Sequence, residues 1–118
     1  MRRRDINPPL AISHLANIGT LRYGWRMEFI WDPDKNALLQ RTRGLGFEGI
    51  VTAIMTGGLV ANMPHPHQER YPQQRVLIVA INNYAYVVPC IVTGEVVELI
   101  TLFPSRKATR DYLRSRSL

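Results

Sequence analysis

The chain has 118 residues, of which 46% are hydrophobic and 20% charged, and it contains a single cysteine. This length and composition predict one globular domain with one core, and they exclude a collagen-like, coiled-coil or largely disordered chain. The single cysteine, Cys90, excludes an intrachain disulfide and zinc modules built on two or more cysteines, and it favours a cytoplasmic location.

The net charge of +6 is concentrated at the two ends of the chain. Residues 1–26 carry +4, residues 27–103 carry −2 and residues 104–118 carry +4. Thirteen of the 15 basic residues are arginine, whose guanidinium group binds phosphate through two parallel hydrogen bonds. We therefore expect a polyanionic partner to contact the C-terminal end rather than the whole surface.

Residues 1–26 show neither helical nor strand periodicity, whereas a segment typical of a domain start begins at Met27. Two interpretations of this leader are open: an extension upstream of the natural start, or an arm with little order. Under both, residues 27–118 form the domain and residues 1–26 are dispensable for folding. The most apolar stretch, residues 76–92, is interrupted by polar residues and is shorter than the roughly 20 residues that a membrane-spanning helix needs.

A short strand over residues 28–31 is followed by a predicted helix hairpin. Asp32-Pro33 is typical of a helix N-terminus, and we expect a helix from Pro33 to about Arg43 that buries Ala37, Leu38 and the stem of Arg41. Gly44 would end it in a left-handed conformation. A second helix is predicted from Phe47 to about Thr56, because apolar residues recur there at helical spacing.

The second half of the chain predicts four strands and a final helix. A polar loop over residues 63–74 separates the first two of these strands, and Asn82-Asn83 can form a two-residue hairpin turn. Pro89 cannot donate to a strand ladder, so it marks an edge or a bulge. The predicted elements are strands over 59–62, 75–81, 84–92 and 96–103 and a helix from Pro104 to about Arg116 with Ser105 as N-cap.

These elements predict an α+β fold in which a two-helix hairpin and a C-terminal helix pack on an antiparallel sheet of about four strands. Three motifs then become informative: Met-Glu-Phe-Ile-Trp-Asp-Pro-Asp-Lys-Asn at 27–36, Gly-Leu-Gly-Phe-Glu at 44–48 and Pro-Ser-Arg-Lys-Ala-Thr-Arg at 104–110. Together they resemble the BrnT-type toxins of bacterial type II toxin–antitoxin systems. The resemblance covers about residues 27–118.

The resemblance implies a RelE/ParE-like fold and an endoribonuclease that a cognate antitoxin neutralises. Contact with operator DNA would be indirect, through the antitoxin, and no membrane is involved. Two departures indicate a divergent branch. The loop segment 65–72 is longer and richer in proline than is usual, and no Glu-Arg-Arg run follows Arg110.

RNA can be cleaved without a metal when a base activates the ribose 2′-OH for attack on the neighbouring phosphate, and cations stabilise the charge that develops. His65 and His67 are candidates for proton transfer, because alternate residues of an extended segment point the same way. They could instead be exposed loop histidines, or weak metal ligands with Glu69. Arg70 and Arg75, which flank the Tyr71-Pro72 turn, are candidate cations, and a salt bridge to Glu69 or Glu98 is the alternative.

The first turn of the final helix is a second candidate, because free N–H groups and the helix dipole attract phosphate there. Lys107 would act there on the transition state, and the other substrate-binding candidates are Ser105, Arg106, Thr109 and Arg110. Two alternatives are a solvated basic helix and a surface that docks an acidic antitoxin.

Tyr84 and Tyr86 share one strand face and could stack RNA bases, or pack half-buried under a helix. Phe29 and Trp31 are expected in the core, and Cys90 is expected to be a small buried hydrophobe. No metal or cofactor is expected.

The sequence thus predicts a metal-independent endoribonuclease toxin. The alternative is a non-catalytic interaction module whose basic helix docks an acidic partner. A DNA-binding regulator is disfavoured by the low charge of residues 27–103, because non-specific DNA affinity grows with the number of phosphates neutralised.

Overall fold

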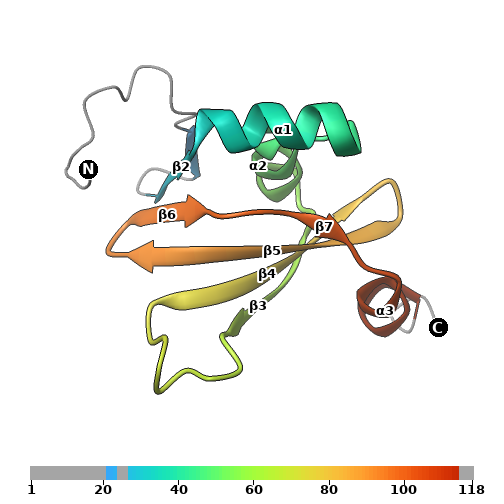
Figure 1. Cartoon of the computed structure of the whole chain (residues 1–118). Coiled ribbons are helices and arrows are strands. Elements are labelled where there is room, and N and C mark those ends of the chain that lie inside the picture. Colours follow the sequence, from blue (N-terminus) through green and yellow to red (C-terminus); the bar gives the residue numbers. More distant parts are fainter. Residues whose placement is uncertain (1–20, 24–26, 115–118) are drawn as a thin grey trace.

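The structure is a computed structural model that describes residues 21–23 and 27–114. These residues form an α+β fold in which one mixed, seven-stranded sheet carries helices on both faces (Figure 1). No helix among them is long and apolar enough to cross a bilayer. The elements are β1 (Leu21–Tyr23), β2 (Met27–Trp31), α1 (Pro33–Arg43), α2 (Phe47–Met55), β3 (Leu59–Pro64), β4 (Gln74–Ile81), β5 (Tyr84–Thr93), β6 (Val96–Leu99), β7 (Phe103–Pro104), α3 (Arg106–Ala108) and η2 (Thr109–Arg114).

The sheet is larger than the four antiparallel strands predicted, and its order is β1-β2-β6-β5-β4-β3 with β7 beside β5. Strands β3 to β6 form an antiparallel meander, as expected. Strand β2, however, pairs with β6 in parallel, with Phe29 opposite Val97. The reason is topological: α1 and α2 return the chain so that β3 runs opposite to β2, and the three reversals of the meander then leave β6 parallel to β2.

Part of the predicted leader belongs to the sheet. Residues 21–23 form β1, an edge strand that pairs antiparallel with β2, with Leu21 opposite Phe29. The sheet therefore extends beyond the domain boundary predicted at Met27. The rest of the leader, residues 1–20 and 24–26, lies outside the described residues, so its dispensability stays a prediction.

Helix α1 has the predicted bounds and caps but turns a different side to the core. The Asp32 carboxylate accepts a hydrogen bond from the Asp34 N–H at 2.9 Å, and Gly44 ends the helix with a φ of 72°. Ala37, Leu38 and Arg41 are exposed, so the prediction that they are buried was wrong. The buried residues of α1 are Asn36 and Leu39.

Asn36 sets this orientation because it joins α1 to the start of α2. Its Oδ1 accepts the Phe47 N–H at 2.7 Å, and its Nδ2 donates to both carboxylate oxygens of Glu48 at 2.9 Å. Gly46 lets the helices approach, because a Cβ there would lie 2.4 Å from the Asn36 Oδ1. We call Asn36, Gly46, Phe47 and Glu48 the α1–α2 junction. Two of the three motifs that carry the BrnT resemblance meet at this junction.

Pro89, predicted to mark an edge or a bulge, lies opposite a bulge that divides the last predicted strand in two. Its carbonyl accepts the Ile100 N–H at 3.0 Å, but proline has no N–H to complete the pair. Cys90 pairs with Leu99 in β6, whereas Val87 pairs with Phe103 in β7, so the register shifts by one residue between them. The single strand predicted over 96–103 is therefore wrong, and the fully buried Leu102 fills the core between its two pieces.

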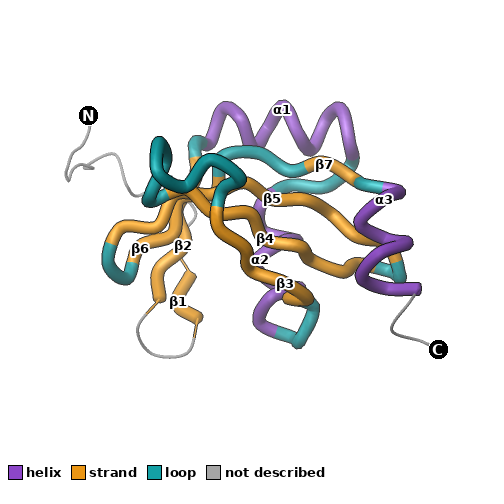
Figure 2. Tube along the Cα trace, turned by 90° about the horizontal axis from the view of Figure 1, so that it is seen from below, coloured by secondary structure: helices purple, strands orange, loops and turns teal. Residues whose placement is uncertain are grey.

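Side chains on both faces of the sheet are buried. Beneath α1 and α2 lies the main core, which includes Phe29 and Trp31 as predicted, each 3% exposed. On the opposite face, Ile78 and Ala85 pack against Ala108 of α3. The chain enters α3 through the predicted N-cap, Ser105, and continues as a π-helix over η2. Figure 2 shows α3 across the end of the strands. We call α3 and η2 together the C-terminal helix.

Candidate functional site

The predicted site residues fall into two groups at opposite ends of the β4–β5 hairpin. Residues 65–73, which we call the β3–β4 loop, adjoin the Gln74↔Ile91 pair at one end. The C-terminal helix begins at the other end, where the Ser105 N–H bonds to the Ala85 carbonyl at 2.9 Å. Residues 85 and 91 of β5 are six positions apart, which corresponds to about 20 Å at the usual rise per residue. The loop and the start of the helix are separated in both views (Figures 1 and 2), whereas further along the helix the Tyr112 hydroxyl lies 3.1 Å from the Met63 sulfur near the end of β3.

Backbone hydrogen bonds within the β3–β4 loop make it compact. The His67 carbonyl accepts the N–H groups of both Arg70 and Tyr71 at 3.0 Å. The loop is closed at its base, because the His65 N–H donates to the Gln74 carbonyl at 3.1 Å. A loop that satisfies its own backbone groups holds its side chains in defined positions, which is what a functional loop requires.

The side chains of this loop form one cluster of rings and a cation. The ring centroids of His65 and His67 are 5.9 Å apart, and those of His65 and Tyr71 are 4.7 Å apart. The guanidinium carbon of Arg70 lies 5.9 Å from the centre of the Tyr71 ring. Except for the partly buried His65, these residues are exposed. The structure thus brings together two imidazoles, a phenol and a guanidinium at the surface.

The two histidines differ in what their rings can do. The His65 Nδ1 accepts the backbone N–H of His67 at 2.9 Å. A nitrogen that accepts a hydrogen bond carries no proton, so the neutral His65 ring is protonated at Nε2 and acts as a donor there. The His67 ring makes no hydrogen bond to any described residue, so both of its nitrogens can exchange protons with a substrate. His67 is therefore the better candidate for proton transfer.

Arg75, predicted to begin a strand, is the second residue of β4, and its side chain is directed to the α2 side of the sheet, where it lines an apolar cavity. Its Nε donates to the Asn62 Oδ1 at 2.6 Å and its Nη2 to the Asn62 carbonyl at 3.3 Å. Within the described part of the chain it forms no salt bridge, so the alternative pairing with Glu69 or Glu98 is not made. Nor does it contact the histidines through any hydrogen bond.

At the start of the C-terminal helix, two candidate phosphate ligands serve the fold. The Ser105 hydroxyl oxygen accepts the Ala108 N–H at 3.0 Å, as an N-cap does. Thr109 is 2% exposed; its hydroxyl donates to the Ser105 carbonyl and accepts the Ala85 N–H, both at 2.8 Å. The Ser105 hydroxyl therefore caps the helix, and the Thr109 hydroxyl holds the helix to β5.

The basic residues of this helix are exposed, and two of them lie beside an acid. The Lys107 Nζ is 2.6 Å from one oxygen of Asp111, and the Arg110 Nε is 3.3 Å from the other. The hydrogen bond from Lys107 is the main reason why the pKa of Asp111 is lowered. Asp111 partly neutralises both cations, and Arg106 is the exposed base that forms no pair among the described residues. The positive charge available to a phosphate at this helix is therefore smaller than the number of its basic residues suggested.

Tyr84 and Tyr86 share a strand face as predicted, with ring centroids 6.3 Å apart in an edge-to-face arrangement. Both are half-buried, and Tyr86 packs against the main core. This arrangement fits two tyrosines that pack against the sheet better than it fits an open surface on which RNA bases could stack. Cys90 is 1% exposed, as expected of a buried hydrophobe, and burial raises the pKa of its thiol to about 11 despite the charge of nearby Arg75.

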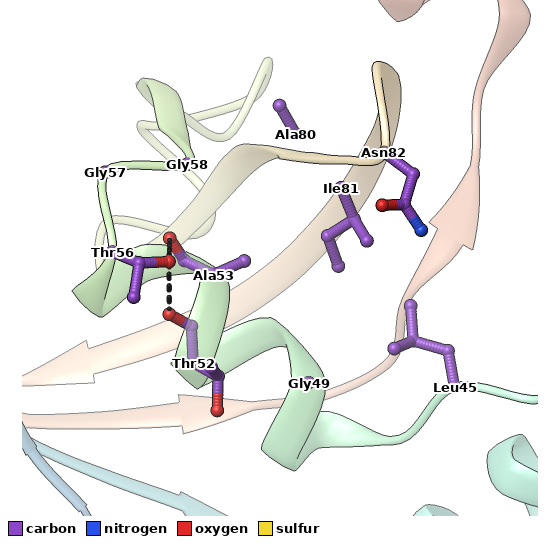
Figure 3. Close-up of a pocket in the computed structure, with 10 residues that line it drawn as sticks. All are labelled: Leu45, Gly49, Thr52, Ala53, Thr56, Gly57, Gly58, Ala80, Ile81 and Asn82. Carbon is purple, nitrogen blue, oxygen red and sulfur yellow. Dashed lines mark hydrogen bonds between the residues drawn. The ribbon is translucent and has the colours of Figure 1, made fainter.

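Two of the hollows lined by described residues adjoin the main core around α2 and β4. The larger, of about 390 Å³, lies where α2 and the Gly57-Gly58 turn meet the end of β4 (Figure 3). Its ten described lining residues carry no charged side chain, and its Thr56 hydroxyl is bonded to the Thr52 carbonyl at 2.9 Å. The smaller, of about 140 Å³, is the apolar cavity beside Arg75. In the described part of the chain, no three histidine, cysteine or acidic side chains are grouped as metal ligands.

Sequence reasoning missed two polar residues that organise these regions, Asn36 and Asn62. Asn36 belongs to the opening motif, so its inclusion there was a signal of a structural role. Asn62 carried no signal, because only the pairing of β3 with β4 brings it to Arg75.

Comparison of the chain with family models, curated proteins and solved structures gives no match.

Proposed function

We propose that this chain is a metal-independent endoribonuclease toxin of the BrnT type with a RelE-like fold, neutralised by a cognate antitoxin, and that the β3–β4 loop carries its chemistry. The observation that carries the proposal is the exposed cluster in that loop. His67 has a ring available for proton transfer, His65 offers an Nε2–H donor, and Arg70 and Tyr71 offer a cation and a stacking surface.

The placement of the helices on the sheet supports the assignment to this family. The helix hairpin on one face of an antiparallel meander and the C-terminal helix on the other agree with the architecture that the resemblance implies. The opening and middle motifs meet at the α1–α2 junction, which gives both of them a structural reason. The motifs therefore support a fold shared with the BrnT-type toxins. The proposed ribonuclease activity rests on the β3–β4 loop instead.

In the proposed mechanism, His67 removes the proton from the ribose 2′-OH, whose oxygen attacks the adjacent phosphorus. The His65 Nε2–H and the Arg70 guanidinium stabilise the negative charge on the non-bridging oxygens. The bond to the 5′-oxygen breaks, and that oxygen takes a proton from solvent. The products are a 2′,3′-cyclic phosphate and a 5′-hydroxyl. The Tyr71 ring offers a stacking surface for a neighbouring base.

The test is cleavage of a defined RNA by the full chain in the presence of EDTA. We expect a cyclic phosphate at the new end and no cleavage of an RNA in which the target nucleotide is 2′-deoxy. Expression without a partner should arrest bacterial growth, and co-expression of the antitoxin should restore it. Activity that EDTA abolishes and zinc restores would instead make His65 and His67 metal ligands.

One observation favours the alternative function, non-catalytic docking of an acidic partner. Arg106 follows closely after Phe103, whose side chain is 38% exposed, so the entry to the C-terminal helix combines a cation with apolar surface. Such a combination is typical of protein interfaces. If this is the main function, RNA is not cleaved under any condition and Arg106→Ala weakens partner binding.

A further inference from the structure

The cavity beside Arg75 has the composition of a binding site rather than of a packing defect. Its inner wall is formed by buried apolar side chains from five elements, including Phe29 of β2, Ile54 of α2 and Leu77 of β4. Its volume of about 140 Å³ is close to that of an apolar cavity known to hold one benzene molecule. An apolar group of about six to eight non-hydrogen atoms would therefore fill it.

Arg75 places one positive charge at the wall of this cavity. The residue is only partly exposed and has no carboxylate partner among the described residues. The neighbouring Cys90 is protonated at neutral pH and does not neutralise it. A charge that is partly removed from water without an opposite charge is unfavourable, so a ligand anion would stabilise the site.

The geometry of Arg75 leaves a defined set of donors for that anion. Asn62 accepts from Nε and Nη2, which together form one side of the guanidinium fork. A guanidinium has five N–H donors, so the end-on pair on Nη1 and Nη2 remains available. This pair matches the two oxygens of a carboxylate, and the bonds to Asn62 hold the plane of the fork in place.

We propose that this cavity binds a small amphipathic carboxylate, such as an aromatic acid or a short aliphatic acid. The carboxylate binds the end-on N–H pair of Arg75, near the exposed Asn62, and the apolar group extends inward to Leu77, Cys90 and Val97. This site is separate from the proposed ribonuclease chemistry, because the ligand contacts no residue to which the mechanism assigns a role.

The test is isothermal titration of the full chain, without RNA, using benzoate and hexanoate as probes. Benzamide keeps the ring and loses the charge, whereas acetate keeps the charge and loses the apolar group. We expect benzoate to bind at one site at least about tenfold more tightly than either, because one charge-assisted pair is worth about a tenfold change or more in affinity. Amide shifts in an NMR titration should centre on Leu77, Cys90 and Val97.

Two variants separate the role of Arg75 from that of charge in general. Arg75→Gln should weaken benzoate about tenfold and leave benzamide unchanged, whereas Arg43→Gln, an exposed arginine at the end of α1, should leave both unchanged. Val92→Leu adds one methylene to the cavity lining and should weaken both. Equal binding of benzoate and benzamide, or no saturable binding of any acid up to about 10 mM, would overturn the proposal. Amide shifts centred on the β3–β4 loop would do the same.

Discussion

The β3–β4 loop and the C-terminal helix both contain polar and basic residues, yet they use them in opposite ways. In the loop, backbone groups satisfy one another, and the rings of His67 and Tyr71 are left at the surface. In the helix, the hydroxyls of Ser105 and Thr109 fasten the element to itself and to β5, and Lys107 lies against Asp111. A polar side chain whose hydrogen bonds hold the fold together is not available to bind or react with a substrate.

This difference separates candidates that look equivalent in sequence. A phosphate site at the helix start would need its hydroxyls and first-turn cations to face the ligand. Both hydroxyls instead form hydrogen bonds within the protein. The loop was expected to place two histidines on one side of an extended segment; residues 66–70 instead form turns, which hold the two rings 5.9 Å apart. The comparison therefore favours the loop over the helix as the place of the proposed chemistry.

The largest expected effect is on catalysis. His67→Ala should lower kcat/KM for RNA cleavage by about 10² to 10⁴, the usual contribution of a general base. Lys107→Ala should lower it by less than about fivefold, because Lys107 is 78% exposed, paired with Asp111 and distant from the loop. Both rates are measured on one RNA with both variants folded. Similar losses in the two variants would contradict the division between loop and helix.

The next effect concerns a polar residue that serves the fold outside both regions. Asn36→Ala should lower the free energy of unfolding by about 2–3 kcal/mol, because it leaves the buried Phe47 N–H without an acceptor and removes the bonds to Glu48. Urea denaturation measures this loss. Gln40→Ala is the matched control, since Gln40 also bonds Glu48 but is exposed, and it should change stability by less than about 0.5 kcal/mol.

A smaller loss is expected for the helix anchor. Thr109→Val keeps the shape of the side chain but leaves the buried Ala85 N–H unsatisfied, so we expect a loss of about 1–2 kcal/mol in the free energy of unfolding. Thr42→Val removes an exposed hydroxyl that bonds a helix carbonyl, and it should cost less than about 0.5 kcal/mol. Equal costs for the two would mean that Thr109 does not anchor the helix.

The smallest effect concerns the surface pair of the C-terminal helix. Because Lys107 lowers the pKa of Asp111 in the folded state, the pair stabilises the protein above the ordinary pKa of a carboxyl group. This contribution is lost as the pH falls through the lowered pKa. Asp111→Asn should therefore be slightly less stable than the parent at neutral pH and equal to it at about pH 2.

High salt tests the same pair in a second way. Salt screens exposed charges, so the small difference between Asp111→Asn and the parent at neutral pH should shrink as the salt concentration rises. Thermal unfolding at low and high salt measures it. A difference that persists at high salt or at acid pH would show that Asp111 acts through something other than its charge.

The sequence by itself determined the local elements, because their signals act over a few residues. Asp32-Pro33 and Gly44 bound the first helix, Asn82 and Asn83 turn the hairpin with φ values of 53° and 64°, and Ser105 caps the last helix. Each is a backbone preference or a local hydrogen bond. Pro89 likewise predicted an edge or a bulge from its missing N–H, and the pairing of β5 on both sides decided for the bulge.

Only the tertiary structure decided how those elements combine. The parallel pairing of β2 with β6 and the addition of β1 depend on contacts between residues distant in the chain, which periodicity does not encode. The buried side of α1 depends on the hydrogen bonds of Asn36 to Phe47 and Glu48 and on the burial of Leu39. The candidate site is divided because the loop and the first turn of the helix lie at opposite ends of the β4–β5 hairpin. Side chains can act together only where the fold brings them within reach.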